Sequence, residues 1–299
     1  MRAPAKLNLY LRVLGRRPDG YHELETLFER IDLADELAFE PAARELSLTG
    51  DDPTLSSGPE NLVLRAARAL RQATRTSRGA RIHLTKRIPI AAGLGGGSSD
   101  AAAALLGLNE LWRLGLGQAE LVRLAGELGA DVPFFLSEAT FAVGRGRGDR
   151  CEPVACVRSL AHVLVVPGER LSTKEIYEAS QFDLTAPKPS ITMVVHALRN
   201  GSLSELADGL WNDLEPEAIR RCPPSALILS HLRDLGCLGT RLSGSGPSVF
   251  GLCRDAPHAQ EVAARLHGLV LGRSVAGPTW RVEIVQTESP SLVVTPSVR

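Results

Sequence analysis

The chain has 299 residues, of which 44% are hydrophobic and 23% are charged, and its 34 basic residues balance 34 acidic ones. A balanced charge gives no electrostatic indication of a nucleic-acid or membrane partner, and the length predicts two domains. The N-terminus lacks the apolar core of a signal peptide, and no apolar run reaches membrane-spanning length, so we expect a cytoplasmic protein. The five cysteines are scattered and match no zinc spacing, so we expect them to be reduced thiols.

The N-terminal residues 5–13 are predicted to form a strand, because apolar and polar side chains alternate there. One face is apolar, and the other carries Lys6, Asn8, Tyr10 and Arg12. This polar face could point into a cleft or lie in solvent at a sheet edge, and periodicity favours neither. Only four of the 34 basic residues are lysine, which marks Lys6 and Lys86 as candidate functional cations.

A turn at residues 18–20 comes next and places Tyr21 and His22 side by side directly after it. Periodicity then predicts strands at residues 26–33 and 36–40, an amphipathic helix at 59–70, a polar loop at 71–79 and a strand at 80–86.

The most informative stretch runs from Pro89 to Asp100, where four of the five residues 93–97 are glycine and an alanine run follows. Glycine lets the backbone adopt positive φ and approach a ligand, and Ser98, Ser99 and Asp100 are residue types that favour helix N-caps. A strand, a glycine loop and a capped helix direct free N–H groups at one point, which predicts an anion site rather than a flexible linker.

This loop matches neither a Walker A loop nor the dinucleotide fingerprint, so backbone amides and serines would hold a phosphate and the positive charge must come from elsewhere. A further helix is predicted at residues 118–128, with Gly129 as its C-cap. Asp131 follows directly before an apolar run, where it could serve as a helix cap or take a chemical role. The glycine-punctuated residues 141–148 are interpreted as a domain junction.

The second half is predicted to begin with a buried strand at residues 161–167 and a short helix at 171–178, with Thr173 near its start. Further elements are expected as helices at 191–199, 203–211, 224–235 and 257–266, two strands around a Gly-Ser-Gly turn within 238–253, and a strand at 280–285. That turn is a second candidate anion loop, although a simple hairpin is the favoured interpretation. Residues from 288 onward are predicted to be loosely held.

Three stretches together resemble the GHMP small-molecule kinases, a superfamily named for galactokinase, homoserine, mevalonate and phosphomevalonate kinases. They are residues 4–8, the loop of residues 89–102 and the segment 242–247. The resemblance narrows to the branch that phosphorylates 4-diphosphocytidyl-2-C-methyl-D-erythritol in the non-mevalonate isoprenoid pathway. Three stretches carry this closer resemblance: residues 15–28 with their Asp-Gly-Tyr-His motif, the extended glycine run 93–100 and Gly-Ala-Asp-Val-Pro at 129–133.

The resemblance implies an α+β fold of two domains, the first like ribosomal protein S5 domain 2 and the second ferredoxin-like, with the active site in the cleft between them. The expected division is an ATP-binding domain over residues 1–150, a substrate-binding domain over 151–285 and a loosely held tail over 286–299. ATP would be the phosphoryl donor, with Mg²⁺ carried by the nucleotide, because no clear glutamate offers a second metal ligand beside the loop serine. A monomer or weak homodimer is expected, acting on a small molecule and not on nucleic acid or membrane.

By the same resemblance, Lys6 matches the catalytic lysine and Asp131 the catalytic base. Phosphoryl transfer needs a phosphate cradle, a cation and a base, and Lys6 beside Asp131 would supply the cation and keep the carboxylate ionised. The expected ATP contacts are Pro89, Ile90, Ala91, Ala92, Gly93, Leu94, Gly95, Gly96, Gly97, Ser98 and Ser99, with Asn61 and Lys86 near the nucleotide base. The expected substrate contacts are Asn8, Tyr21, His22, Thr173 and Tyr177, of which Tyr21, His22 and Tyr177 would hold the cytosine.

Two alternative functions stay open at this point. A GHMP kinase of the homoserine or mevalonate type acts on a substrate without a base, so Tyr21, His22 and Tyr177 argue against it. A catalytically silent nucleotide-binding or regulatory relative would be expected to have lost Lys6 or Asp131, and both are present.

Overall fold

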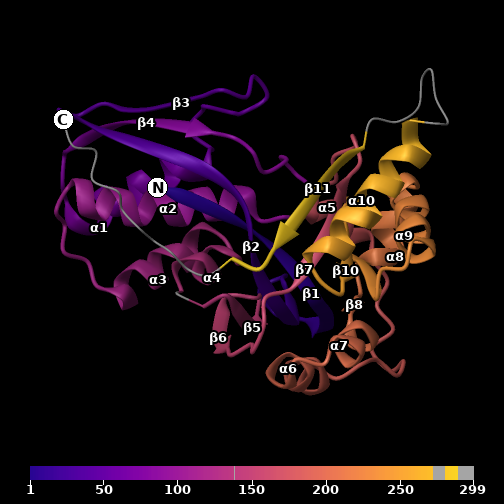
Figure 1. Ribbon diagram of the computed structural model, residues 1–299. Coiled ribbons are helices and arrows are strands. Elements are labelled where there is room, and N and C mark those ends of the chain that lie inside the picture. Colours follow the sequence, from indigo (N-terminus) through magenta and orange to yellow (C-terminus); the bar gives the residue numbers. More distant parts are fainter. Residues whose placement is uncertain (138, 272–279, 289–299) are drawn as a thin grey trace.

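The larger of the two described β-sheets is built mainly from strands of the first half of the chain. The computed structural model describes residues 1–137, 139–271 and 280–288. The larger sheet in these ranges has seven strands: β1 (Arg2–Arg16), β2 (His22–Ala42), β3 (Leu46–Gly50), β4 (Gly79–Thr85), β5 (Phe141–Gly146), β6 (Arg150–Val154) and β8 (Trp211–Asn212). Their order is β3-β4-β2-β1-β8, and β5 pairs with β2 and β6 (Figure 1).

The long antiparallel hairpin of β1 and β2 forms the middle of this sheet. β2 is one continuous strand, so the prediction of two separate strands at residues 26–33 and 36–40 is wrong. The register shifts at Pro4/Ala5, where the partner changes from Ala34 to Ile31. Residues 32 and 33 of β2 therefore form a β-bulge at the end of the first predicted strand, and β2 continues through this bulge without a break.

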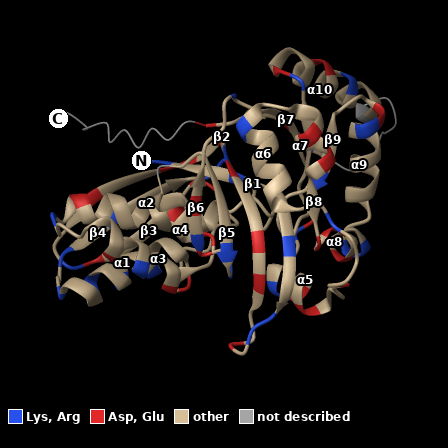
Figure 2. Ribbon diagram, turned by 90° about the horizontal axis from the view of Figure 1, so that it is seen from below, with Lys and Arg blue, Asp and Glu red and all other residues tan. Residues whose placement is uncertain are grey.

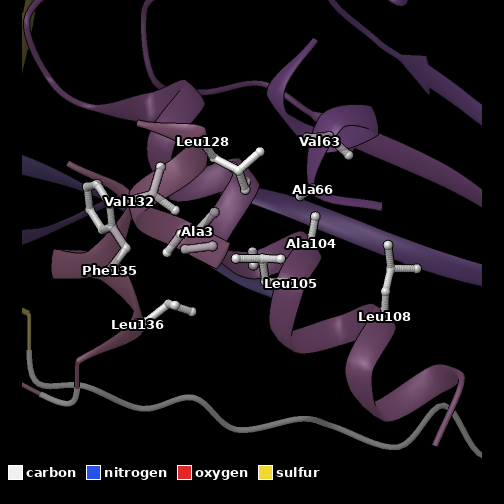
Figure 3. Close-up of a cluster of buried hydrophobic side chains, with 14 of the residues drawn as sticks. Ala3, Val63, Ala66, Ala104, Leu105, Leu108, Leu128, Val132, Phe135 and Leu136 are labelled. Atoms are coloured by element: carbon white, nitrogen blue, oxygen red, sulfur yellow. The ribbon is translucent and has the colours of Figure 1, made fainter. Parts of the chain in front are cut away.

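Four helices pack against the larger sheet. They are α1 (Leu62–Thr74), α2 (Gly96–Leu111), α3 (Gln118–Leu128) and α4 (Val132–Leu136), so α1 extends into the predicted loop 71–79. Their apolar side chains meet in one cluster, which Figure 3 shows around Leu105 with Val63, Leu128 and Phe135. Residues 99–105 of α2 are all buried, because short alanine side chains let neighbours approach this helix from every side. The N-terminus of α2 is therefore held by the core.

The smaller sheet lies in the second half of the chain. In the described residues it has four antiparallel strands in the order β11 (Arg281–Gln286), β7 (Ala161–Val166), β10 (Val249–Cys253) and β9 (Gly239–Leu242). The helices of this half are α5 (Thr173–Ala179), α6 (Ile191–Asn200), α7 (Leu203–Gly209), α8 (Glu215–Arg221), α9 (Pro224–Asp234) and α10 (Ala256–Leu271). The sequence did not predict α8 or the short strand β8.

The junction between the two halves differs from its prediction. Residues 141–146 are β5, which pairs with β2 inside the larger sheet, and β6 extends that sheet to Val154. The glycine-punctuated segment is therefore a strand and a turn inside the larger sheet, and it does not separate two sheets as a domain junction would. The domain division at residue 150 stays a proposal, and strand pairing favours a boundary after Val154. The second half also returns one strand to the larger sheet, since β8 pairs in parallel with Tyr10 and Leu11.

The beginning of the predicted tail is held in place. Thr287 forms a β-bridge with Ile31 and donates its backbone N–H to Leu160 O (3.0 Å), and Glu288 donates its N–H to Arg30 O (2.9 Å). The expectation of a loosely held segment is wrong for residues 286–288, and residues 289–299 lie outside the described ranges. Among the helices of the described ranges, none has both the length and the apolar composition that crossing a membrane requires.

Candidate active site

Lys6 lies on the polar face of β1, and this face points into the interior. Lys6, Asn8 and Tyr10 of this face are all at most 3% exposed, so the alternative of a solvated face is excluded. The Lys6 side chain is 3% exposed, and its Nζ donates to Asn8 Oδ1 (2.5 Å) and Gly93 O (2.7 Å). Burial lowers the pKa of Lys6, and the nearby Asp131 carboxylate opposes this effect.

Asn8 holds the lysine in this orientation. Its Oδ1 accepts from Lys6, its Nδ2 donates to Thr26 Oγ1 (2.8 Å), and Thr26 Oγ1 donates in turn to Tyr10 O (2.7 Å). The backbone N–H of Asn8 donates to Ser243 Oγ (3.3 Å). The amide of Asn8 is therefore fixed from both ends, which gives the Lys6 ammonium group a defined position.

Asp131 faces Lys6 from the start of α4. Its position is that of the helix N-cap, yet its side chain makes no capping hydrogen bond, so the cap alternative does not explain its carboxylate. Asp131 Oδ2 lies 3.9 Å from Lys6 Nζ, and the side chain is 33% exposed. A carboxylate that is partly open to a cavity and lies beside a buried ammonium group can accept a proton from a bound hydroxyl.

The glycine loop passes directly over Lys6. Gly93 and Gly95 adopt φ values of 78° and 71°, which favour glycine. A Cβ atom on Gly95 would come within 3.0 Å of Lys6 Cγ, so the loop backbone lies against the lysine side chain. Gly95 is the N-cap of α2, and Ser98 and Ser99 fall within its first turn. The interpretation of those serines as the cap is therefore wrong.

The second half of the chain closes this site through the turn between β9 and β10. Ser243 Oγ donates to Gly93 O (3.0 Å), which also accepts from Lys6. Asn212 of β8 fixes the turn by donating its Nδ2 to Leu242 O (2.9 Å) and Gly244 O (2.8 Å). The predicted hairpin is confirmed, and its turn forms part of the wall of the site.

Asn61 and Lys86 lie on the glycine-loop side of the site, and their polar groups have partners inside the protein. Asn61 caps α1 by accepting from Val63 N (2.9 Å) and donates its Nδ2 to Ser56 O (2.7 Å). Lys86 Nζ lies between the carboxylates of Asp35 and Asp100 and donates to both. The predicted contacts of Asn61 and Lys86 with the nucleotide base stay predictions.

Asp35, Lys86 and Asp100 form a buried cluster beneath the loop, which joins β2, the end of β4 and the first turns of α2. Asp35 Oδ1 also accepts the backbone N–H groups of Arg87 (2.6 Å) and Ile88 (2.8 Å). Burial acts to lower the pKa of Lys86, but the two carboxylates outweigh it and the pKa is raised. Burial raises the pKa of Asp100 to about 7, against the opposing effect of Lys86.

The aromatic residues gather at the other end of the site. Figure 2 shows the β1–β2 hairpin reaching alongside α5, and the His22 ring stacks on Tyr177 with centroids 5.3 Å apart. Thr173, one turn earlier on α5, lies within hydrogen-bond distance of Ser245, with 2.8 Å between the two hydroxyl oxygens. Tyr21 is 57% exposed and does not contact Tyr177 through a ring stack; the Arg147 guanidinium lies over its ring instead.

One cavity of about 1290 Å³ connects both ends of the site. Every predicted site residue lines it except Ser99, which is buried with no partner for its Oγ in the described residues. The cavity wall also contains residues that the sequence did not indicate, and Thr26, Arg65, Arg147, Gly244 and Ser245 are among them. Two of these, Gly244 and Ser245, lie in the segment 242–247 that carried the family resemblance, whereas local sequence gives no signal for Thr26 or Arg65.

Known proteins match the chain along most of its length. The GHMP kinases N terminal domain family matches residues 61–139, and the GHMP kinases C terminal family matches residues 194–269. A 4-diphosphocytidyl-2-C-methyl-D-erythritol kinase of Pelotomaculum thermopropionicum is 48% identical over 264 residues, which cover 88% of this chain and 92% of the relative. The chain belongs to this family of GHMP kinases. Family membership decides against the homoserine and mevalonate types that the sequence left open.

Solved structures agree with this membership. A crystal structure of 4-(cytidine 5'-diphospho)-2C-methyl-D-erythritol kinase is 39% identical with a TM-score of 0.77, covering 95% of this chain and 99% of the other. A homoserine kinase from Cytophaga hutchinsonii is 20% identical with a TM-score of 0.76, covering 97% and 95%, and this likeness shows the fold alone. The predicted two-domain GHMP kinase fold is confirmed.

Proposed function

We propose that this protein transfers the γ-phosphoryl group of ATP to the 2-hydroxyl group of 4-diphosphocytidyl-2-C-methyl-D-erythritol, with Asp131 as base. The observation that carries the proposal is the position of Asp131 and Lys6, 3.9 Å apart in the middle of one cavity. Toward one end the cavity wall is the glycine loop, and toward the other it is the rings of His22 and Tyr177. A nucleotide donor and a cytidyl acceptor would thus meet at the same carboxylate.

In the reaction, the 2-hydroxyl oxygen attacks the γ-phosphorus of ATP and the bond between the γ-phosphorus and the bridging oxygen breaks, which releases ADP. The hydroxyl proton passes to Asp131, and a positioned base of this kind contributes about 10²–10⁴-fold. Lys6 supplies a positive charge next to the reacting groups. Its hydrogen bonds to Asn8 and Gly93 O keep that charge in place during the transfer, so little reorganisation is needed.

The phosphates of ATP would lie against the backbone of residues 93–99. The first N–H groups of α2 have no partner within the helix and point out of its N-terminus, where the helix dipole favours negative charge. Mg²⁺ bound to the phosphates would neutralise part of their charge. In the described parts of the chain, no group of three or more His, Cys, Asp or Glu side chains could hold a metal ion, and we propose that the nucleotide carries Mg²⁺ into the site.

The cytosine would bind at the aromatic end. Burial, with a smaller effect of Arg16, lowers the pKa of His22, so a neutral imidazole with one donor and one acceptor nitrogen faces the base at neutral pH. His22 and Tyr177 are already in ring contact, which leaves no room for a base between them. We propose that the base replaces His22 on the Tyr177 ring and that the imidazole turns to hydrogen-bond the edge of the base.

A coupled assay of ADP formation tests this function. The wild-type protein should turn over ATP with 4-diphosphocytidyl-2-C-methyl-D-erythritol and not with homoserine or mevalonate, and the product should carry its new phosphate on the 2-hydroxyl group. Comparable turnover with homoserine or mevalonate, or none with the cytidyl substrate, would overturn the proposal. A monomer or weak homodimer and a cytoplasmic location stay predictions, which light scattering and cell fractionation can check.

A further inference from the structure

We propose that Arg147 is a positioning residue that fixes the ring of Tyr21 so that only one face is open to the substrate base. The Arg147 guanidinium carbon lies 5.1 Å from the centroid of the Tyr21 ring, and both residues line the cavity. A guanidinium group over an aromatic face is attracted by the negative charge of the π-system. The inference rests on the proposed function, because it assumes that Tyr21 belongs to the cytosine site.

The two residues meet because of the register of the larger sheet. Tyr21 lies at the tip of the β1–β2 hairpin, and Arg147 lies in the turn between β5 and β6. β2 and β5 are paired partners with Leu24 opposite Gly146, so the turn that follows β5 reaches the tip from which β2 begins. Two hairpin tips that are far apart in sequence are thus neighbours at the mouth of the cavity.

Arg147 is itself held tightly, whereas Tyr21 is not. Asp149 Oδ2 accepts from Arg147 Nε (3.0 Å) and Nη2 (2.9 Å), and Gly126 O of α3 accepts from Nη2 (3.0 Å). Asp149 balances the charge of the guanidinium group, so Arg147 is committed to the protein rather than free to bind a phosphate. Tyr21 is 57% exposed at the end of a turn, and the fixed guanidinium group of Arg147 lies over its ring.

This arrangement selects the side from which a base can stack. The guanidinium group covers one face of Tyr21, so a base can stack only on the opposite face. A ring that is already oriented loses less conformational entropy when substrate binds. Arg147 therefore acts on the affinity for the cytidyl substrate through Tyr21 and takes no part in phosphoryl transfer.

Steady-state kinetics of Arg147→Ala test the proposal. KM for the cytidyl substrate should rise about three- to tenfold, while kcat and KM for ATP stay within about twofold of wild type. KM of Arg147→Lys for the cytidyl substrate should lie between the values of the wild type and Arg147→Ala, because lysine keeps the charge but loses the planar fork that Asp149 holds. Arg145→Ala is the matched control: Arg145 is also ion-paired, with Glu25 and Glu152, but it does not line the cavity, and its loss should leave KM unchanged.

A double-mutant cycle separates positioning from direct contact. Tyr21→Ala alone should raise KM for the cytidyl substrate, and adding Arg147→Ala to it should have no further effect. If Arg147→Ala raises KM equally with and without Tyr21, the guanidinium group binds the substrate itself and the inference is wrong. If Tyr21→Ala raises KM and Arg147→Ala does not, the inference fails while the proposed function stands. If the wild type does not turn over the cytidyl substrate, both fail.

Discussion

The two ends of the cavity are built in different ways. At the nucleotide end, the glycine loop and the first turn of α2 supply backbone groups, and the cluster of Asp35, Lys86 and Asp100 lies buried beneath them. At the base end, rings and guanidinium groups stand on hairpin tips and on the short helix α5, which come from both halves of the chain. Figure 2 shows the hairpin and α5 side by side.

This difference separates two tasks. Phosphates are alike in every nucleotide and carry charge, so a rigid backbone cradle binds them well and does not need to discriminate. A base is recognised by stacking and by polar groups on its edge, and a site that leaves such groups unpaired rejects the wrong analogue. Lys6 and Asp131 lie where the two ends meet. If the two ends are independent, a substitution at one end should leave the binding of the other substrate unchanged.

The largest effect is expected at the meeting point. Asp131→Asn should lower kcat by about 10²–10⁴-fold, because the amide cannot accept the hydroxyl proton. KM for both substrates and the melting temperature should change little, since the Asp131 side chain makes no capping bond in α4. Steady-state kinetics with each substrate varied in turn check this. A variant that keeps more than about a tenth of wild-type kcat would remove Asp131 from its role.

At the nucleotide end, Gly95→Val should weaken ATP binding at least about tenfold, or about 1.4 kcal/mol. A β-branched residue resists the φ of 71°, and its Cβ would lie 3.0 Å from Lys6 Cγ and 3.1 Å from Phe135 Cζ. The shift in melting temperature on adding ATP measures the loss. Gly168→Val is the control, because Gly168 is exposed and a Cβ atom added there would have no neighbour within 4 Å. An ATP shift of wild-type size in Gly95→Val would place the nucleotide elsewhere.

At the base end, Tyr177→Ala should raise KM for the cytidyl substrate about tenfold and leave KM for ATP nearly unchanged, since stacking contributes about 1–3 kcal/mol per base. Tyr177→Phe keeps the ring and should bind like wild type. His22→Ala should in addition relax the preference for cytidine over uridine forms of the substrate. A rise in KM for ATP of the same size in Tyr177→Ala would contradict the independence of the two ends.

The smallest effect concerns the buried cluster and its dependence on pH. The folded pKa of Asp100, about 7, lies above its unfolded value of 3.8, so the folded chain binds more protons between these values. Its contribution to stability is fully present below about pH 4 and is lost as the pH rises toward 7. Asp100→Asn cannot titrate, so the wild type should lose a few degrees of melting temperature relative to this variant between pH 5 and pH 8. An equal change in both proteins would show that Asp100 is ionised throughout.

The local sequence was sufficient to predict the glycine loop that lines the cavity. The order of strand, glycine loop and alanine-rich helix predicts an anion site at residues 89–99, because φ freedom and helix propensity are properties of short segments. For Asp131, the helix end before it and the apolar run after it left a helix cap and a chemical role open, and only the family resemblance gave it the expected role of base. Local patterns also failed in identifiable places: the stretch around a bulge in the β1–β2 pairing looked like a break between two strands, and the glycines of residues 141–148 looked like a domain junction.

Only the tertiary structure decided which way the polar face of β1 points. Lys6 is buried because the glycine loop, whose Gly93 follows 87 residues later, lies against its side chain and because the turn at Ser243 packs on Gly93. The same holds for the Asp35 carboxylate at Lys86, 51 residues apart in the sequence, and for Arg147 over Tyr21. Such contacts depend on sheet register and on the packing of distant segments, and no window of the sequence contains that information.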